Sequence, residues 1–319
     1  MENFKPVNSL ESPRFCGVKT FMRLPYVPDI SGKQVDFVIV GAPFDTGSTF
    51  RVGARFGPEH IRSTSVLWRP YNNVQGINIF DYLSGVDYGD VPVVPGFIEE
   101  SYQKIADTMY TITKAGAIPI ILGGDHSISL ANLRGIYKQH GEVCLIHFDA
   151  HVDTMDSYFG KLYNHGTPFR RATEERIIDP KCSIQIGVRG SAYGPEDWEA
   201  SEKMGFTVIP THVAKEMSAD DLVEKIKQTV GDRKVFFTFD IDFVDPAYAP
   251  GTGTPEAGGF SSYETLKILQ KLTGLNVVGY DLVEVLPAYD HPAEITSFLA
   301  SAIIFEFITA IALNKRDGR

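Results

Sequence analysis

Acidic and imidazole side chains follow the end of a predicted buried strand near the middle of this chain. The apolar run VCLIHF (143–148) is typical of a buried strand, and Asp149, His151 and Asp153 come directly after it at alternate positions. In an extended segment, residues two apart point the same way, so this spacing directs three metal-binding side chains toward one place.

Two further strand ends carry side chains of the same kinds. The run VFFTF (235–239) predicts a second buried strand, which is followed by Asp240 and Asp242 with the same spacing of two. The run IPIIL predicts a third strand, which leads through a Gly-Gly turn into Asp125 and His126. The sequence therefore predicts a metal site built from three strand ends.

The candidate metal ligands are two imidazoles and four carboxylates: His126, Asp149, His151, Asp153, Asp240 and Asp242. Six side chains are too many for one ordinary catalytic ion, whereas two divalent cations bridged by Asp149 and Asp240 would use all six and lie about 3.5–4 Å apart. Because carboxylates outnumber imidazoles and no thiolate takes part, the set favours Mn²⁺ over Zn²⁺ or copper, and the imidazoles leave Ni²⁺, Co²⁺ and Fe²⁺ open.

Each candidate also has an ordinary structural interpretation. His126 could be the neighbour of a helix cap, Asp125 could be the cap itself, and Asp240 or Asp242 could simply end a strand. Taken together these interpretations are weaker, because so many charges packed together without a cation would remain uncompensated.

Alternating strand and helix patterns predict an α/β fold. Continuously apolar strands indicate a mostly parallel sheet covered by helices on both faces, in which ligands gather at the carboxyl ends of the strands. No linker or repeat divides the chain, so we expect a single domain over residues 1–319, with an N-terminal arm (1–32) that packs on the body or on another subunit. The predicted strands are 35–40, 118–122, 143–148, 183–188, 207–209, 235–239 and 277–280, and the predicted helices begin near 58 or span 98–115, 127–138, 219–230, 262–272 and 294–313.

Composition excludes several classes of protein. The 319 residues carry a net charge of −10 and lack a Lys/Arg-rich block, which argues against a nucleic-acid partner. The Gly-rich segment after the first strand contains neither GxGxxG nor GxxxxGK[ST], which argues against a nucleotide. The N-terminus does not resemble a signal peptide, and Glu306 interrupts the apolar C-terminal helix, so we expect no membrane span and a cytoplasmic protein.

The three cysteines lack metal-type spacing. Cys144 and Cys182 lie inside apolar runs and are interpreted as small buried hydrophobic residues, and no disulfide is predicted for them or for Cys16.

Four sequence blocks resemble those of the ureohydrolases, the arginase and agmatinase superfamily. They are GGDHS (123–127), DAHVD (149–153), TFDIDFVDPAYAPGTGTPEAGG (238–259) and VEVLPAYD (283–290). The resemblance extends from about Val35 to the C-terminal helix and is strongest to the guanidinopropionase and guanidinobutyrase group. It implies a three-layer α/β/α arginase-type fold, a binuclear manganese centre, hydrolysis of a guanidino group to urea and an amine, and a homotrimer or homohexamer.

The resemblance also implies roles for individual residues. A water bridging the two ions would become the hydroxide that attacks the guanidinium carbon, with Asp153 orienting it. His165 in NHGT resembles the proton-shuttle histidine, and Glu284 in VEV resembles the carboxylate that pairs with the guanidinium. The structural alternatives are that His165 is a loop histidine with a structural hydrogen bond, and that Glu284 is a strand-end charge paired with a lysine. One metal would bind His126, Asp149, Asp153 and Asp240, and the other Asp149, His151, Asp240 and Asp242.

Differences between the members of this superfamily reduce the number of candidate substrates. Arginine is disfavoured, because Met155 replaces the arginase Asn that reads the substrate carboxylate, and Gly190 and Ala192 replace an acidic pair. Tyr158 falls where guanidinopropionase has a Tyr and guanidinobutyrase a Met, and a bulky ring both shortens a pocket and can bind a carboxylate. Plain loop packing is the alternative for Tyr158. We also expect Met155 and Asn164 beside the substrate.

The first expectation is therefore a 3-guanidinopropionate hydrolase. A 4-guanidinobutyrate hydrolase or an agmatinase, which would release urea and putrescine, is the second. A non-catalytic regulatory subunit of the same fold is a third, although the intact ligand set argues against it. A two-metal phosphoesterase is a fourth, although no basic residue lies within the ligand motifs.

Overall fold

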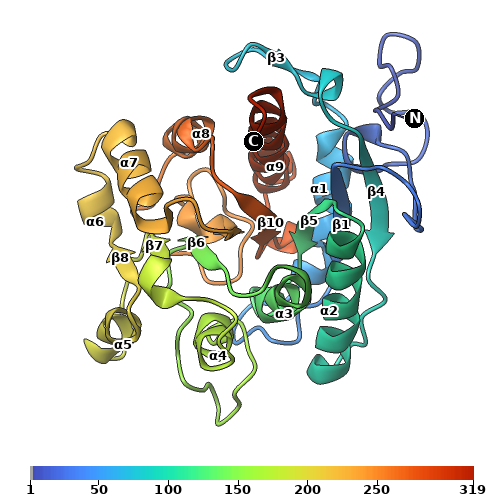
Figure 1. Cartoon of the computed structure of the whole chain (residues 1–319). Coiled ribbons are helices and arrows are strands. Elements are labelled where there is room, and N and C mark those ends of the chain that lie inside the picture. The colour runs from blue at the N-terminus through green and yellow to red at the C-terminus, as the bar shows by residue number, and fades with distance from the viewer. Residues whose placement is uncertain (1–2) are drawn as a thin grey trace.

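A twisted sheet of parallel strands lies between two layers of helices in the computed structural model, which describes residues 3–319 (Figure 1). The eight strands of this sheet follow the order β4-β1-β5-β10-β9-β6-β7-β8, and every neighbouring pair is parallel. The strands are β1 (Phe37–Ala42), β4 (Gly85–Asp90), β5 (Ile118–Gly123), β6 (Cys144–Phe148), β7 (Ile184–Ile186), β8 (Thr207–Ile209), β9 (Val235–Asp240) and β10 (Val277–Val283). A two-stranded antiparallel sheet, β2 (Tyr71–Asn72) with β3 (Ile77–Asn78), stands apart.

Helices cover both faces of the sheet, as the continuously apolar strands predicted. Helices α2, α3 and α4 lie on one face, and α1, α7, α8 and α9 lie on the other (Figure 1). Strands β1, β5, β9 and β10 in the middle of the sheet are buried along almost their whole length. The helices are α1 (Gly57–Ser65), α2 (Ile98–Lys114), α3 (Ile128–His140), α4 (Pro168–Glu174), α5 (Glu196–Met204), α6 (Thr211–Ala214), α7 (Ala219–Val230), α8 (Ser262–Lys271) and α9 (Ile295–Arg316). The prediction of a three-layer α/β/α fold is confirmed.

Helix α9 belongs to the core of the fold. It has the length and composition of a membrane span, but 89% of its most apolar window is buried inside the protein. The carboxylate of Glu306 accepts hydrogen bonds from Asn72 Nδ2 (3.1 Å) and Gln270 Nε2 (3.0 Å), so its polar group is satisfied within the protein. This is the placement of a central helix in a water-soluble protein.

The N-terminal arm lies against the body of the protein where the structure describes it. Phe4, Phe21, Leu24 and Ile30 are buried, and Tyr26 forms a β-bridge with Asp87 of β4. The first two residues of the predicted arm lie outside the described residues. Contact with another subunit stays a prediction.

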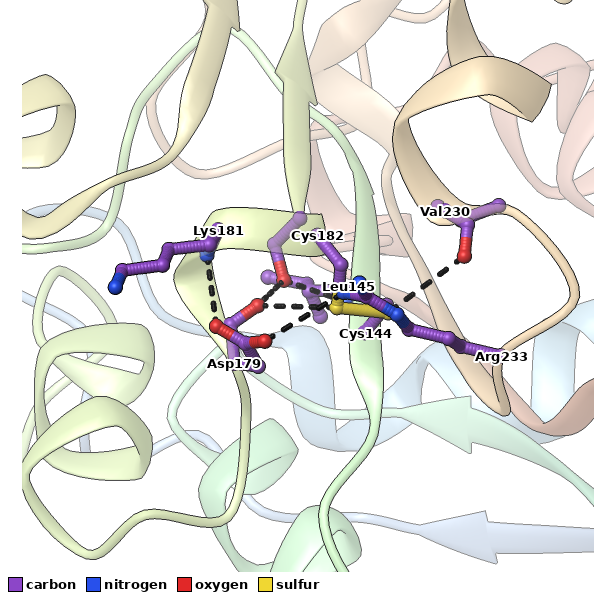
Figure 2. The surroundings of a disulfide bond; sticks show 8 residues. Cys144, Leu145, Asp179, Lys181, Cys182, Val230 and Arg233 are labelled. Atoms are coloured by element: carbon purple, nitrogen blue, oxygen red, sulfur yellow. Dashed lines mark hydrogen bonds and ion pairs between the residues drawn. A yellow bond between two sulfur atoms is a disulfide. The ribbon is translucent and has the colours of Figure 1, made fainter.

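The expectation that Cys144 and Cys182 form no disulfide is wrong. The two sulfurs are bonded, with Cα atoms 5.3 Å apart, at the start of β6 and just before β7 (Figure 2). Strands β6 and β7 pair Ile146 with Ile184, an offset of 38 positions that equals the separation of the two cysteines. Parallel register therefore sets the cysteines side by side, and register cannot be read from apolar runs alone.

Candidate functional site

Four strand ends at one edge of the sheet hold the predicted site. Asp240 ends β9, Asp149 follows β6, and His126 follows β5 after the Gly-Gly turn. Strand β10 lies between β5 and β9 and brings Glu284, which follows its last residue, to the same edge. Strands β9 and β6 are neighbours in the sheet, whereas β10 separates β5 from them.

The DAHVD segment does not continue β6 as an extended strand. Residues after Phe148 leave the sheet, and Asp153 has a positive φ of 50°, a left-handed conformation that side chains other than glycine rarely adopt. The alternate spacing therefore predicted correctly that Asp149 and Asp153 lie close together, but continued extension of the strand is not the cause. A turn, rather than continued extension, brings Asp153 back toward Asp149.

One group of side chains is deep inside the protein around His126. Its Nδ1 lies 3.0 Å from Asp149 Oδ2, 2.9 Å from Asp153 Oδ2 and 3.3 Å from Asp240 Oδ2. The other ring nitrogen, Nε2, lies 2.9 Å from the hydroxyl of Thr238. The His126 side chain is fully buried, so these three carboxylates face it without water between them.

A second group lies nearer the surface around His151. Its Nδ1 lies 3.2 Å from Asp149 Oδ1 and 3.1 Å from Asp242 Oδ2, and its side chain is 34% exposed. Asp149 thus presents one oxygen to each group. That arrangement suits a carboxylate that bridges two ions, as the sequence predicted, whereas the distances for Asp240 place it with the His126 group.

The electrostatics of both groups fit a bound cation. His126 Nδ1 and Asp242 Oδ2 are buried and make no hydrogen bond of acceptable geometry. Burial and repulsion from Asp242 and Asp149 raise the pKa of Asp240, and burial and repulsion from Asp149 raise the pKa of Asp242 to about 6. Divalent ions would supply the missing partners and remove the repulsion. Two groups of side chains could hold an ion: His126 with His147, Asp149 and Asp153, which are all buried, and Asp149 with His151 and Asp242, of which His151 is partly exposed.

His165 and Glu284 lie together beside the deep group. His165 Nδ1 is 3.3 Å from Glu284 Oε1, which also accepts the backbone N–H of His126 at 2.9 Å. Burial acts to lower the pKa of His165, but the hydrogen bond and charge of Glu284 outweigh it and raise the pKa to about 9. When His165 Nε2 is protonated, it can donate a hydrogen bond to the Thr49 hydroxyl at 2.6 Å; when it is unprotonated, it can accept one from the Thr49 N–H at 3.2 Å. Both protonation states of His165 therefore find partners, as a proton shuttle requires.

A cavity of about 340 Å³ opens above the two groups. Met155 and Tyr158, which we expect beside the substrate, both line it, and their contact with substrate stays a prediction. Asn164 is not among the lining residues, because its amide donates to Lys161 O (3.2 Å) and accepts the Gly166 N–H (3.0 Å) within its own loop. That amide holds the loop in shape. The lining residues are Thr49, Ala150, His151, Val152, Asp153, Met155, Tyr158, His165, Gly166, Arg189, Ser191, Ala192, Tyr193, Asp197, Trp198, Asp240 and Thr254.

The charged side chains on the cavity wall are largely committed to protein partners. Arg189 donates to the carbonyl oxygens of Gly187, Asp242, Phe243 and Glu256, which leaves its guanidinium little capacity for a ligand.

Two tyrosines from different loops meet at the rim of the cavity. The hydroxyls of Tyr158 and Tyr193 are hydrogen-bonded to each other, and Asp197 lies nearby, where its carboxylate accepts the Tyr193 N–H at 2.7 Å. The distal part of the cavity is therefore hydroxylic and aromatic, with one carboxylate.

Sequence reasoning missed His147, Thr49, Tyr193 and Asp197. His147 could have been found, because it precedes Asp149 by two positions on β6 and therefore shares its face. Thr49 and Tyr193 are on loops and Asp197 is in the first turn of α5; all three are far from the ligands in sequence, and no local pattern marks them.

The fold and this buried cluster define a metal-dependent hydrolase of the α/β class, and comparison with known proteins identifies its family. Residues 35–310 match the Arginase family. The chain is 42% identical over 308 residues to the guanidinobutyrase of Pseudomonas aeruginosa, covering 96% of each protein, and 39% identical over 309 residues to the guanidinopropionase of the same organism, covering 97% of this chain and 96% of that enzyme.

A solved structure shows the same relationship. The proclavaminate amidino hydrolase of Streptomyces clavuligerus superposes with a TM-score of 0.89 at 40% identity, covering 94% of this chain and 99% of that one. The chain therefore belongs to the Arginase family, and it is an amidinohydrolase. The predicted membership of the ureohydrolases is confirmed.

Proposed function

We propose that this protein hydrolyses the guanidino group of a small guanidino acid, 3-guanidinopropionate first, to urea and an amino acid. The observation that carries the proposal is the convergence of His126 and His151 with four aspartates at the base of a small cavity. Two Mn²⁺ ions per subunit suit this carboxylate-rich set, with Ni²⁺ or Co²⁺ as alternatives. Such ions supply the acidity that makes a water nucleophilic near neutral pH.

The side chains around the cluster have distinct parts in the reaction. Asp153, which faces both His126 and the cavity, accepts a hydrogen bond from the attacking water and aims it at the guanidinium carbon. The water oxygen attacks the planar guanidinium carbon while Asp153 takes up one proton of the water, which gives a tetrahedral adduct. Its C–N bond to the amine then breaks as His165 gives its proton to the departing nitrogen, and the remaining O–H proton passes to the His165 imidazole as the C=O bond of urea forms. Glu284 holds His165 in its protonated form, and its charge also favours the cationic guanidinium nearby.

The cavity favours a short substrate. Its volume of about 340 Å³ is at the small end for ligand sites, and Tyr158 narrows it opposite the cluster. Because Arg189 is committed to carbonyl groups, the carboxylate of a guanidino acid would be bound by hydroxyl donors, chiefly Tyr158 and Tyr193.

Agmatine is the second candidate, and one residue favours it. Asp197 on the cavity wall would attract the ammonium group at the far end of agmatine and repel a carboxylate. The longer acid 4-guanidinobutyrate would need Tyr158 to move aside. The assembled ligand groups argue against a non-catalytic subunit, and the commitment of Arg189 argues against a phosphoesterase.

Urea release from a panel of guanidino compounds tests the proposal. Protein loaded separately with Mn²⁺, Ni²⁺ or Co²⁺ would be assayed with 3-guanidinopropionate, 4-guanidinobutyrate, agmatine and arginine. We expect the highest kcat/KM for 3-guanidinopropionate with Mn²⁺. Faster hydrolysis of agmatine or 4-guanidinobutyrate would overturn the substrate assignment, and release of urea from none of them would overturn the activity.

We also propose a cytoplasmic homo-oligomer, a trimer or hexamer, without nucleic-acid or membrane partners. The net charge of −10 and the burial of α9 support the absence of those partners. Light scattering of the purified protein measures the assembly directly.

A further inference from the structure

Behind the metal-binding edge of the sheet, a line of buried polar side chains runs from α5 to Asp149. His147 Nε2 lies 2.7 Å from Asp149 Oδ2, and His147 Nδ1 lies 3.0 Å from Gln185 Nε2. The Gln185 side-chain oxygen accepts a hydrogen bond from the hydroxyl of Ser201. His147, Gln185 and Ser201 are fully buried, so each of these contacts replaces water.

The contacts fix which atoms donate. Gln185 Nε2 lies 2.6 Å from the carbonyl oxygen of Val152, which can only accept, so this atom of the amide must be the NH₂ group. Its second hydrogen then points to His147 Nδ1, which must accept. A neutral imidazole that accepts at Nδ1 carries its proton on Nε2, and that proton points to Asp149.

We propose that His147, set by Gln185 and Ser201, is a positioning residue that orients the bridging carboxylate of Asp149. Asp149 Oδ2 accepts from His147 Nε2, and Oδ1 accepts from the backbone N–H of His151 at 2.6 Å. Each oxygen thus has one fixed donor and keeps a lone pair for a cation. With both oxygens held, the plane of the carboxylate is set before any ion binds.

A direct ligand role for His147 is the competing interpretation, since its ring lies near His126, Asp149 and Asp153. The hydrogen bonds argue against it. A ligating nitrogen must be unprotonated with its lone pair free, whereas Nδ1 is occupied by Gln185 and Nε2 carries a proton toward Asp149. The ring of Phe169, 4.5 Å away between centroids, packs against His147 and keeps it in place.

This inference rests on the proposed metal centre but is independent of the substrate, so its test measures Mn²⁺ binding to the metal-free full-length protein by calorimetry. Partners that orient metal ligands typically contribute about 10–100-fold in affinity. We expect His147→Leu to weaken Mn²⁺ binding by about that factor while two ions still bind. His147→Gln should restore most of the affinity, because its amide nitrogen can occupy the place of Nε2 as a donor.

A second pair of variants keeps the test valid if His147→Leu does not fold. Ser201→Ala removes the far end of the line and should weaken Mn²⁺ binding, whereas Ser183→Ala is the matched control. The Ser183 hydroxyl is equally buried, accepts from Leu145 N (2.8 Å) and donates to Asp179 O (2.7 Å), so its hydrogen bonds among the described residues do not involve the line. Electron paramagnetic resonance of the Mn²⁺-loaded proteins should show a changed coupling between the ions in His147→Leu and an unchanged one in Ser183→Ala.

Three results would overturn the inference. Unchanged Mn²⁺ affinity and coupling in His147→Leu would show that the carboxylate needs no such donor. A loss of one of the two ions in that variant would make His147 a ligand. Equal losses of Mn²⁺ affinity in Ser201→Ala and Ser183→Ala would show that these side chains act only through general packing of the core. If wild-type protein bound no divalent ion, the proposed metal centre itself would fail, which is a separate outcome.

Discussion

The floor and the rim of the cavity are built in opposite ways. The floor consists of side chains from strand ends, such as His126 and Asp240, which are almost wholly buried and held by several protein partners. The rim is formed chiefly by the loop residues Tyr158 and Tyr193: Tyr193 is 80% exposed, and its hydroxyl is hydrogen-bonded to that of Tyr158. The sheet therefore positions the candidate metal ligands, whereas two loops form the far part of the cavity.

The largest expected effect comes from breaking the floor. Asp242→Ala should remove one of two bound ions and reduce turnover by about 10³-fold or more, because activation of water depends on the metal. The fold should survive, since besides His151 the Asp242 carboxylate contacts only the Ala150 N–H (3.0 Å) among its hydrogen-bond partners in the described chain. Metal analysis beside the urea assay checks both points.

Asp156→Ala is the matched control for that variant, because Asp156 is an exposed aspartate of the rim loop that pairs with Arg171. It should bind two ions and keep its activity. Full metal content with unchanged turnover in Asp242→Ala would contradict the role of Asp242.

The second effect tests His165, where floor and rim meet. His165→Asn should lower kcat about 100-fold, at the low end for general acid catalysis because water can enter the cavity and replace the donor. The number of bound ions should stay at two. A loss of bound metal together with activity would instead show that His165 helps to hold the metal-binding side chains in place.

The pH profile makes the same test sharper. Glu284 raises the pKa of His165 to about 9, so the imidazolium predominates below that pH and is lost as pH rises through it. The rate of the wild-type enzyme should therefore fall above about pH 9, and His165→Asn should lack that fall. Glu284→Gln keeps the acceptor for His126 N–H but removes the charge, and should move the fall to lower pH.

The floor was largely predictable from the sequence, and the rim was not. Apolar runs that end in Asp or His identify strand ends, and parallel strands place their ends at one edge, so the ligand set follows from periodicity. Strand β4 was missed because its sequence, GVDYGD, combines glycines and acids at the edge of the sheet, where β1 is its one neighbouring strand among the described residues. The contact between Tyr158 and Tyr193 depends on the course of two loops, which no local pattern specifies.

Register was the second quantity hidden from the sequence. An offset of 38 positions between β6 and β7 pairs His147 with Gln185 and also brings Cys144 to Cys182. Each residue of these pairs is ordinary by itself in a buried strand. Their chemistry arises only when the strands are aligned, which explains why both the disulfide and the line behind Asp149 were missed.

The third effect concerns the segment that links floor to rim. The disulfide (Figure 2) closes a loop that contains the DAHVD segment, Tyr158 and His165. Cys144 is the first residue of β6, whereas the ligand Asp149 follows the last one, so the disulfide and the ligands lie at opposite ends of this strand. Loop closure of this length typically contributes about 2–4 kcal/mol to the free energy of unfolding, so reduction should lower the midpoint of urea denaturation. The double variant Cys144→Ala/Cys182→Ala should be equally destabilised and insensitive to dithiothreitol.

The same measurement bears on localisation. Stable disulfides are uncommon in a reducing cytosol, so in the proposed cytoplasmic location the thiols of Cys144 and Cys182 should be largely reduced. Alkylation of free thiols during cell lysis, without reductant, would show whether Cys144 and Cys182 are bonded to each other inside the cell. If reduction left the urea-denaturation midpoint of the purified protein unchanged, the disulfide would not contribute to the stability of the fold.

The smallest effect belongs to the rim alone. Tyr158→Met removes a hydroxyl that would bind the substrate carboxylate and replaces a rigid ring with a flexible chain, which lengthens the cavity toward Tyr193. We expect the ratio of kcat/KM for 4-guanidinobutyrate over 3-guanidinopropionate to rise about tenfold, the usual scale for a change of one methylene in a pocket. Tyr158→Phe separates the two causes, because it keeps the ring and loses only the hydroxyl: it should weaken both acids alike and leave the ratio unchanged. Metal content should be untouched in both variants, since Tyr158 contacts no ligand of the floor. An unaltered ratio in Tyr158→Met would mean that this ring only packs the loop, and specificity would then have to come from Asp197 and the opposite wall.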